Sequence, residues 1–109
     1  MNTTALLHHM AHTYATCLRT VRVKTADYSG NDDVFRTMRG VEAFRICSTE
    51  QGILSRMSEK MGRISNLIVN EQKPLVKDEP VEQALRDLLG HGAILLAYLD
   101  TKKGTIDPT

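Results

Sequence analysis

Apolar residues recur at three- and four-residue steps along most of the chain, the spacing that places side chains on one face of an α-helix. The first such segment covers residues 3–22, and residue 2 or 3 can cap its start. Its apolar stripe comprises Leu7, Met10, Tyr14, Cys17 and Val21. The pattern predicts an amphipathic helix whose stripe faces a core.

Two further helices are predicted downstream. Residues 23–31 are polar and turn-forming, so we expect a loop there, with Gly30 able to take a positive φ. A second helix is predicted over 33–45 and a third over 48–70. Ser48-Thr-Glu-Gln51 has the spacing of a capping box at the start of the third helix. The apolar stripe predicted for that helix comprises Ile53, Leu54, Met57, Met61, Ile64, Leu67 and Ile68.

The fourth predicted helix is apolar on two faces. A linker over 70–77 precedes it, the Asp78-Glu79-Pro80 run opens it, and Gly104 is the expected stop, with residues 100–109 as a C-terminal tail. A helix with two apolar faces lies either at the centre of its bundle or against another copy of the chain. No segment alternates as a strand does. The pattern therefore predicts one all-α, four-helix bundle-like domain over 1–109 that forms a homo-oligomer.

Composition limits the classes of function. The chain has 109 residues, of which 41% are hydrophobic and 25% charged, as in ordinary globular domains, and its formal charge is +1. So small a net charge argues against the class of proteins that wrap duplex nucleic acid. The sequence has no apolar run of about 18 residues and no leader pattern, so we expect neither a membrane span nor secretion. Cys17 and Cys47 are expected to be free thiols in a reducing cytoplasm.

Two groups of residues are candidates for a ligand site. Lys24, Asp27 and Tyr28 place a cation, a carboxylate and an aromatic ring in the predicted loop. Further along, three cations line one flank of the third helix, at about 100° per residue. These are Arg56, Lys60 and Arg63. Such a flank suits phosphate or carboxylate, although a solvated flank paired with Glu59 is the simpler interpretation.

A magnesium-dependent enzyme is the competing hypothesis, and its carboxylates would be Glu59, Glu79, Glu82 and Asp87. Glu79 and Glu82 share a face, but Glu82 and Asp87 lie roughly 140° apart around the axis and do not readily chelate one ion. No Gly-rich phosphate loop and no nucleophile motif is present. The residues alone thus indicate no catalytic group and no cofactor, with Mg²⁺ kept for the enzyme alternative.

Three motifs occur in order: Lys24…Asp27-Tyr28-Ser-Gly30…Phe35, then Arg56-Met-Ser-Glu-Lys60-Met-Gly-Arg63…Asn66-Leu67, then Val76-Lys-Asp78-Glu79-Pro-Val-Glu82…Leu85-Arg-Asp87-Leu88. Over about residues 24–99 this order resembles the nucleotide modification associated domain 1 family of small phage and bacterial proteins. The chain is also loosely similar to the all-α nucleoside triphosphate pyrophosphatases. It departs from their paired acidic motifs, because its third predicted helix is basic.

The resemblance implies a link to nucleotides. Carried onto this sequence, it implies ligand-binding roles for Lys24, Asp27, Tyr28, Arg56, Lys60, Arg63 and Glu82. The favoured expectation is a cytoplasmic, phage-type protein that binds a nucleotide, and sequesters a nucleotide immune signal, in a cationic pocket walled by a tyrosine. The alternatives are a magnesium-dependent nucleotide pyrophosphohydrolase and a helical interaction module without a small ligand.

Overall fold

The computed structural model describes residues 1–30, 32–75 and 79–104. Within these ranges the chain forms four helices and no strand: α1 (Thr3–Ser29), α2 (Gly40–Ala43), α3 (Thr49–Ile68) and α4 (Val81–Lys103). The predicted all-α, bundle-like class is confirmed.

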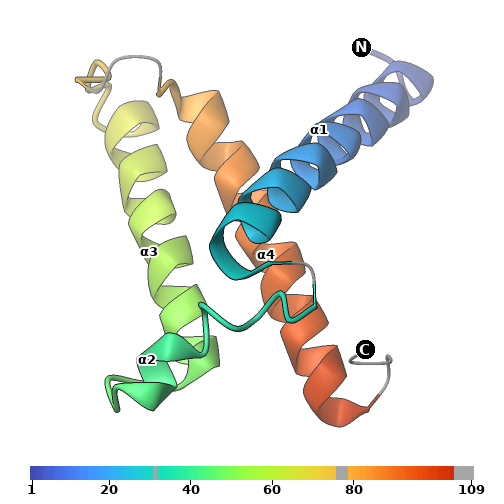
Figure 1. Cartoon of the computed structure of the whole chain (residues 1–109). Helices are drawn as coiled ribbons and strands as arrows, with labels where there is room; N and C mark the ends of the chain where they lie inside the picture. The colour runs from blue at the N-terminus through green and yellow to red at the C-terminus, as the bar shows by residue number, and fades with distance from the viewer. Residues whose placement is uncertain (31, 76–78, 105–109) are drawn as a thin grey trace.

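α1 and α3 both pack against α4 (Figure 1). α3 and α4 form an antiparallel pair joined by residues 69–80, and the one-turn helix α2 packs against α3. α1 crosses α4 and, among the described helices, packs on α4 alone. The N-terminal half of α1 projects beyond the rest of the molecule. α1 and α3 therefore stand apart on either side of α4.

Local capping signals locate three helix ends as predicted. The Asn2 side chain accepts a hydrogen bond from the Ala5 N–H at 2.9 Å. At the start of α3, the Gln51 N–H donates to Ser48 Oγ at 3.1 Å, and the Ser48 N–H donates to Gln51 Oε1 at 3.0 Å. Gly104 ends α4 in the left-handed region at φ 74°. Each cap satisfies backbone groups that the helix itself leaves unpaired.

The loop predicted over 23–31 is wrong for its greater part, because α1 continues through Ser29. Residues 23–29 contain neither glycine nor proline, and Lys24, Ala26 and their neighbours keep the helical hydrogen bonds going. The helix ends at the first glycine, Gly30, whose φ is 76° and whose N–H donates to the Ala26 carbonyl at 3.2 Å. Lys24, Asp27 and Tyr28 are thus helical residues.

The second helix predicted over 33–45 is also wrong in extent, since only Gly40–Ala43 is α-helical. Thr37 explains much of the difference. Its N–H donates to Ser29 Oγ at 3.2 Å, and its hydroxyl donates to the Tyr28 carbonyl at 2.7 Å. These bonds to the end of α1 replace the bond that Thr37 would make in a continuous helix. The Asp33 carboxylate also accepts from the Phe35 N–H and pairs with Arg39.

The fourth helix begins at Val81, with Pro80 as its N-cap residue, slightly later than predicted. Residues 76–78, including Asp78, lie outside the described residues. The expected tail needs correction as well: residues 100–103 belong to α4, and residues 105–109 lie outside the described part.

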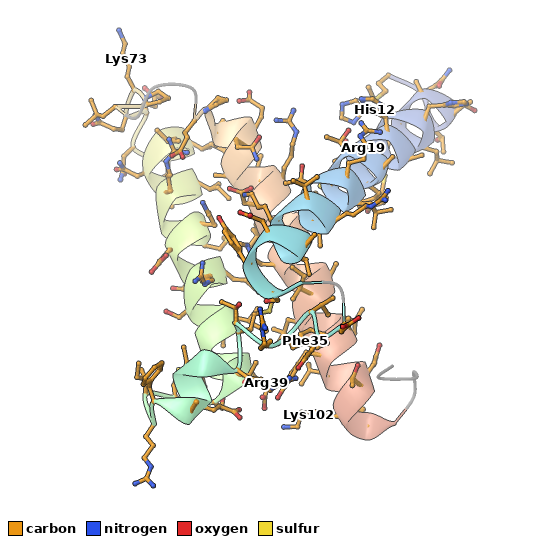
Figure 2. All side chains as sticks on the ribbon, in the orientation of Figure 1. His12, Arg19, Phe35, Arg39, Lys73 and Lys102 are labelled. Atoms are coloured by element: carbon orange, nitrogen blue, oxygen red, sulfur yellow. The ribbon has the colours of Figure 1, made fainter. Side chains whose placement is uncertain are left out.

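The core is small and centred on the α3–α4 pair. Its buried apolar residues are Ile53, Ile64, Ala84 and Tyr98. Phe35 reaches across from the segment before α2 and meets Tyr98 edge to face, with ring centroids 5.1 Å apart (Figure 2). The stripe predicted for the first helix is only partly buried, because Leu7 and Tyr14 are 58% and 48% exposed. Figure 1 shows the N-terminal half of α1 extending away from α3 and α4.

None of the described helices is both long enough and apolar enough to cross a lipid bilayer.

Candidate functional site

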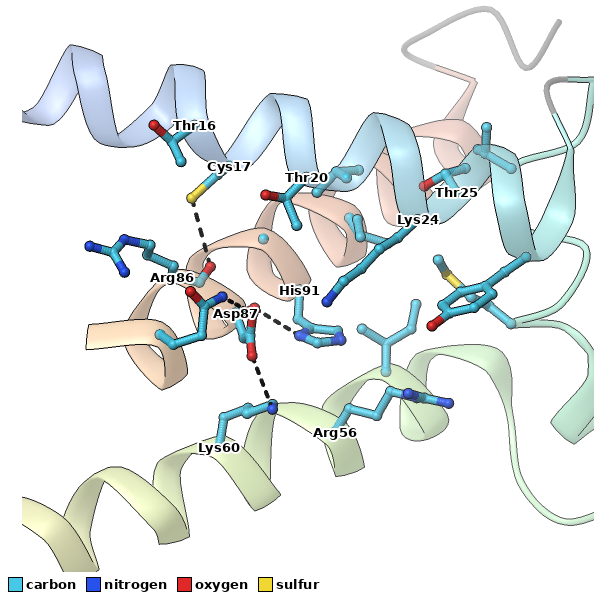
Figure 3. Close-up of a pocket in the computed structure, with 18 of the residues that line it drawn as sticks. Thr16, Cys17, Thr20, Lys24, Thr25, Arg56, Lys60, Arg86, Asp87 and His91 are labelled. Carbon is cyan, nitrogen blue, oxygen red and sulfur yellow. Dashed lines mark hydrogen bonds and ion pairs between the residues drawn. The ribbon is translucent and has the colours of Figure 1, made fainter. Parts of the chain in front are cut away.

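A cavity of about 510 Å³ lies where α1 and α3 diverge over α4 (Figure 3). Side chains from all three helices line it, together with residues of the segment between α1 and α2. The volume lies within the range of roughly 300–1,000 Å³ that small-molecule sites occupy. The cavity follows directly from the packing, because α1 rests on α4 without reaching α3.

The cavity wall is strongly cationic. Its lysine, arginine and acidic residues are Lys24 from α1, Arg56 and Lys60 from α3, and Arg86 and Asp87 from α4. Four cations face one carboxylate, a balance of three positive charges with the histidines neutral. The net charge of the whole chain is only +1, so the positive charge of the cavity wall is a local concentration that the net charge does not show. A partly enclosed cluster of this kind attracts anions.

Lys60 and Asp87 form an ion pair on the cavity floor, with Nζ and Oδ2 3.0 Å apart. Gln83 donates a second hydrogen bond to the Asp87 carboxylate, also at 3.0 Å. Partial burial acts to raise the pKa of Asp87. The hydrogen bonds from Lys60 and Gln83 and the charges of Lys60 and Lys24 outweigh it and lower that pKa below its ordinary value. Asp87 is therefore a carboxylate at neutral pH.

Lys24 and Arg56 are the cations best placed to take an anion. Among the described residues, no carboxylate lies within ion-pairing distance of either side chain, whereas Lys60 already has Asp87. Figure 3 shows Lys24 directed from α1 into the space above α4, with Arg56 on α3 across the same space. The two groups come from opposite walls, and an anion between them can contact both.

His91 adds an imidazole to the same floor. Its Nδ1 lies 2.7 Å from the Asp87 carbonyl oxygen. A carbonyl only accepts hydrogen bonds, so Nδ1 carries the proton and Nε2 is left to interact with a ligand. Figure 3 shows the ring beside Lys24 and Lys60.

Hydroxyl groups line the α1 side of the cavity. Thr13, Thr16 and Thr20 follow one another at three- and four-residue steps, so they share a face of the helix. The Thr16 hydroxyl donates to the His12 carbonyl at 3.0 Å and accepts from Arg19 at 3.2 Å. The Thr16 proton is thereby engaged, so Thr13 and Thr20 are the hydroxyls that can donate to the oxygens of a sugar or a phosphate.

Four of the residues predicted from sequence are brought together at the cavity: Lys24, Tyr28, Arg56 and Lys60. Tyr28 is 64% exposed at the cavity edge, so much of its ring is free for contact with a ligand. The fold thus brings Lys24 and Tyr28 of α1 into the same cavity as Arg56 and Lys60 of α3.

Three predicted ligand-binding residues lie elsewhere. Asp27 and Glu82 are exposed and do not line the cavity. Arg63 also lies outside its lining, and its guanidinium instead donates to the backbone carbonyl of Glu79, joining α3 to the segment before α4. Arg63 therefore has a structural contact that accounts for its position.

The carboxylates of the enzyme alternative are dispersed. Asp87 lines the cavity, whereas Glu59, Glu79 and Glu82 do not. Within the described ranges, no group of three or more His, Cys, Asp or Glu side chains is arranged to hold a metal ion.

Gln83, Arg86, His91 and the threonines of α1 are lining residues that the sequence reasoning missed. A signal for them exists. Gln83, Asp87 and His91 recur every four residues, and Thr16, Thr20 and Lys24 do the same on α1. Each set is a polar stripe on a helix that packs within the domain. Two such stripes on neighbouring helices indicate a polar cavity.

No protein-family model matches the chain, and the searches of curated proteins and of solved structures also returned no match. The resemblance to the nucleotide modification associated domain 1 family therefore remains an expectation from the sequence.

Proposed function

We propose that the protein binds a nucleotide or a nucleotide-derived signal in the cavity between α1, α3 and α4. The observation that carries this proposal is the concentration of Lys24, Arg56, Lys60 and Arg86 around a single carboxylate in one partly enclosed cavity. Phosphate groups accept short, charge-assisted hydrogen bonds from arginine and lysine, and their several oxygens can contact more than one cation.

The cavity also offers contacts for the rest of a nucleotide. Tyr28 stands at the edge with much of its ring exposed. Stacking of a base on such a ring is worth on the order of 1–3 kcal/mol in nucleic-acid binders. Threonine hydroxyls and Gln83 supply neutral hydrogen-bonding partners for a sugar or a base edge. Phosphate, sugar and base thus each have a complementary group within one cavity.

Binding without turnover is favoured over hydrolysis. Asp87 is the one carboxylate among the described lining residues, and Lys60 already neutralises it. A two-carboxylate magnesium site needs acidic groups from facing helices, and the facing side of α3 presents Arg56 and Lys60. In a phage-type protein acting in the bacterial cytoplasm, the proposed use of such binding is sequestration of a nucleotide defence signal.

The first experiment distinguishes binding from catalysis. The full chain is incubated with mono-, di-, tri- and cyclic nucleotides plus Mg²⁺, then heat-denatured, and the released molecules are identified by mass spectrometry. We expect a nucleotide to raise the melting temperature and to be recovered intact. Release of monophosphate or pyrophosphate indicates the hydrolase, and the absence of any stabilising nucleotide contradicts both ligand hypotheses.

The second experiment tests the site. Arg56→Ala is expected to weaken binding of the nucleotide found above by about tenfold or more, the loss of one charge-assisted hydrogen bond of about 1.4 kcal/mol or above. Arg36→Ala is the matched control, because Arg36 is an exposed arginine outside the cavity lining. Isothermal titration calorimetry measures both. Wild-type affinity in Arg56→Ala, with circular dichroism showing a folded chain, contradicts the assignment of the site.

A further inference from the structure

The molecule exposes far more surface than a folded monomer of its size. Its accessible surface is 8352 Å². A compact monomer of 12.2 kDa exposes roughly 6,000 Å². The radius of gyration is 15.8 Å, against about 13 Å for a compact chain of this length. The excess surface is roughly 2,300 Å² per chain, which exceeds the ~800 Å² that each partner buries in a standard interface. Interfaces of obligate homodimers bury areas of this larger size.

Part of this surface is an apolar face on the α3–α4 pair. On α3 it consists of Leu54, Met61 and Ile68, and on α4 of Leu85, Leu89 and Leu96. These six large side chains are 41% to 60% exposed. We call this surface the apolar back face. Monomeric proteins rarely leave a contiguous set of this kind in water.

The two stripes of the back face lie on the same side of the helix pair. At about 100° per residue, the α4 leucines are roughly 180° from Gln83, Asp87 and His91, which line the cationic cavity. The α3 stripe is turned roughly 120° from Arg56 and Lys60. At the seam between the stripes, a Cβ on Gly92 would lie 3.7 Å from the Met57 terminal methyl group. The back face is therefore opposite the cavity and continuous across both helices.

The apolar surface continues onto α1. A groove of about 600 Å³ joins Tyr14 and Leu18 of α1 to Leu89 and Ala93 of α4. Leu18 is 70% exposed. α1 thus extends the back face beyond the helix pair.

We propose that a second copy of this chain covers the apolar back face, so that two α3–α4 pairs pack together as a four-helix core. The seven-residue spacing of Leu54, Met61 and Ile68 suits side-chain packing between helices that cross at a shallow angle. The stripes contain no charged residue, so an identical face meets them without burying an unpaired charge. The net charge of +1 produces little repulsion between copies.

Sedimentation equilibrium of the full chain at micromolar concentration tests this proposal. We expect a mass of about 24 kDa, twice that of the 12.2 kDa chain. Leu89→Glu is expected to halve that mass. Leu75→Glu is the matched control, because Leu75 is 87% exposed in the connection after α3 and off the back face, and it keeps the wild-type mass. A wild-type mass of one chain, or an undiminished mass in Leu89→Glu, overturns the proposal.

A second measurement uses the unaltered protein, in case Leu89→Glu loses its helical circular dichroism. Isotope-labelled and unlabelled chains are mixed, and filtered NMR detects contacts between methyl groups of different copies. Contacts among Met61, Leu89 and Leu96 methyls support the proposal, and their absence overturns it. Leu89 does not line the cationic cavity, so the outcome is independent of whether a nucleotide binds.

Discussion

At the scale of single residues, the Lys60–Asp87 pair determines how the cavity is charged. The carboxylate neutralises one cation and, through the hydrogen bond from Gln83, is fixed on α4. Lys24 and Arg56 keep their full charge toward the cavity, since no carboxylate in the described part of the chain pairs with them. The same pair joins α3 to α4, so it contributes to folding as well as to the site.

The pH dependence of stability follows from the lowered pKa of Asp87. A carboxylate whose pKa is lower in the folded chain stabilises the fold above its ordinary value of 3.8, and that contribution is lost as the pH falls through the folded-state pKa. Asp87→Asn is expected to cost about 1 kcal/mol at pH 7, with the difference from wild type disappearing in acid. Urea unfolding over a series from about pH 2 to pH 7, which extends below the ordinary pKa of 3.8, measures it.

Asp32→Asn is the control for that measurement, because Asp32 is an exposed aspartate outside the cavity. It should change stability little at any pH. A loss in Asp87→Asn that stays constant from neutral pH into acid would show that the ion pair is not its cause.

At the scale of the elements, helix ends depend on two kinds of interaction. Asn2, Ser48 and Gly104 act through groups only a few residues away, and their helices begin or end where the local pattern predicts. The segment before α2 is shaped instead by Thr37, which bonds to Ser29 and Tyr28 eight and nine residues earlier. Contacts at that separation depend on where α1 ends, so the local pattern did not reveal them.

Gly30 and Gly62 provide a matched pair of substitutions at this scale. An added Cβ meets nothing within 4 Å at either position, so neither change causes a steric clash. Gly30 has φ 76° and ψ −175°, a conformation nearly confined to glycine, and Gly30→Ala is expected to cost about 1–3 kcal/mol. Gly62 lies inside α3, where alanine should stabilise by about 0.5–1 kcal/mol.

Thermal and urea unfolding of the two variants measures these effects. Because neither added Cβ meets a neighbouring atom, opposite changes in unfolding free energy for the two variants would be due to backbone conformation and not to side-chain crowding. Equal stability of Gly30→Ala and the wild type would mean that α1 does not end at Gly30 in the way described.

At the scale of the whole molecule, cavity and back face have a common origin. α1 packs on α4 alone, which leaves the cationic cavity open between α1 and α3 and leaves apolar stripes exposed on the other side of the pair. Positive charge and apolar surface are thereby separated onto opposite sides. A second copy on the back face leaves the cavity accessible to a ligand.

Because the proposed second copy binds only the folded chain, thermal stability should depend on protein concentration. Mass action adds about 1.4 kcal/mol for each tenfold increase, which corresponds to a rise in Tm of about 3–6 °C for a dimer of this size. Differential scanning calorimetry at three concentrations measures the shift. The monomeric variant Leu89→Glu should show none, and a wild-type Tm independent of concentration would contradict the dimer.

The sequence by itself determined the helical class, the capped starts of α1 and α3, the end of α4 at Gly104, and the cationic character of one flank of α3. Each of these features depends on residues within a turn or two of one another. Only the tertiary structure decided that Lys24 and Tyr28 are helical residues facing Arg56 and Lys60, that Arg63 bonds to Glu79 instead, and that part of the apolar stripes predicted for α1 and α3 is exposed. The first outcome depends on the crossing of α1 over α4, and the other two depend on which helices pack against one another and which faces they leave uncovered. Helical periodicity predicts which residues share a face of a helix, whereas the way the helices cross decides which neighbour packs against that face.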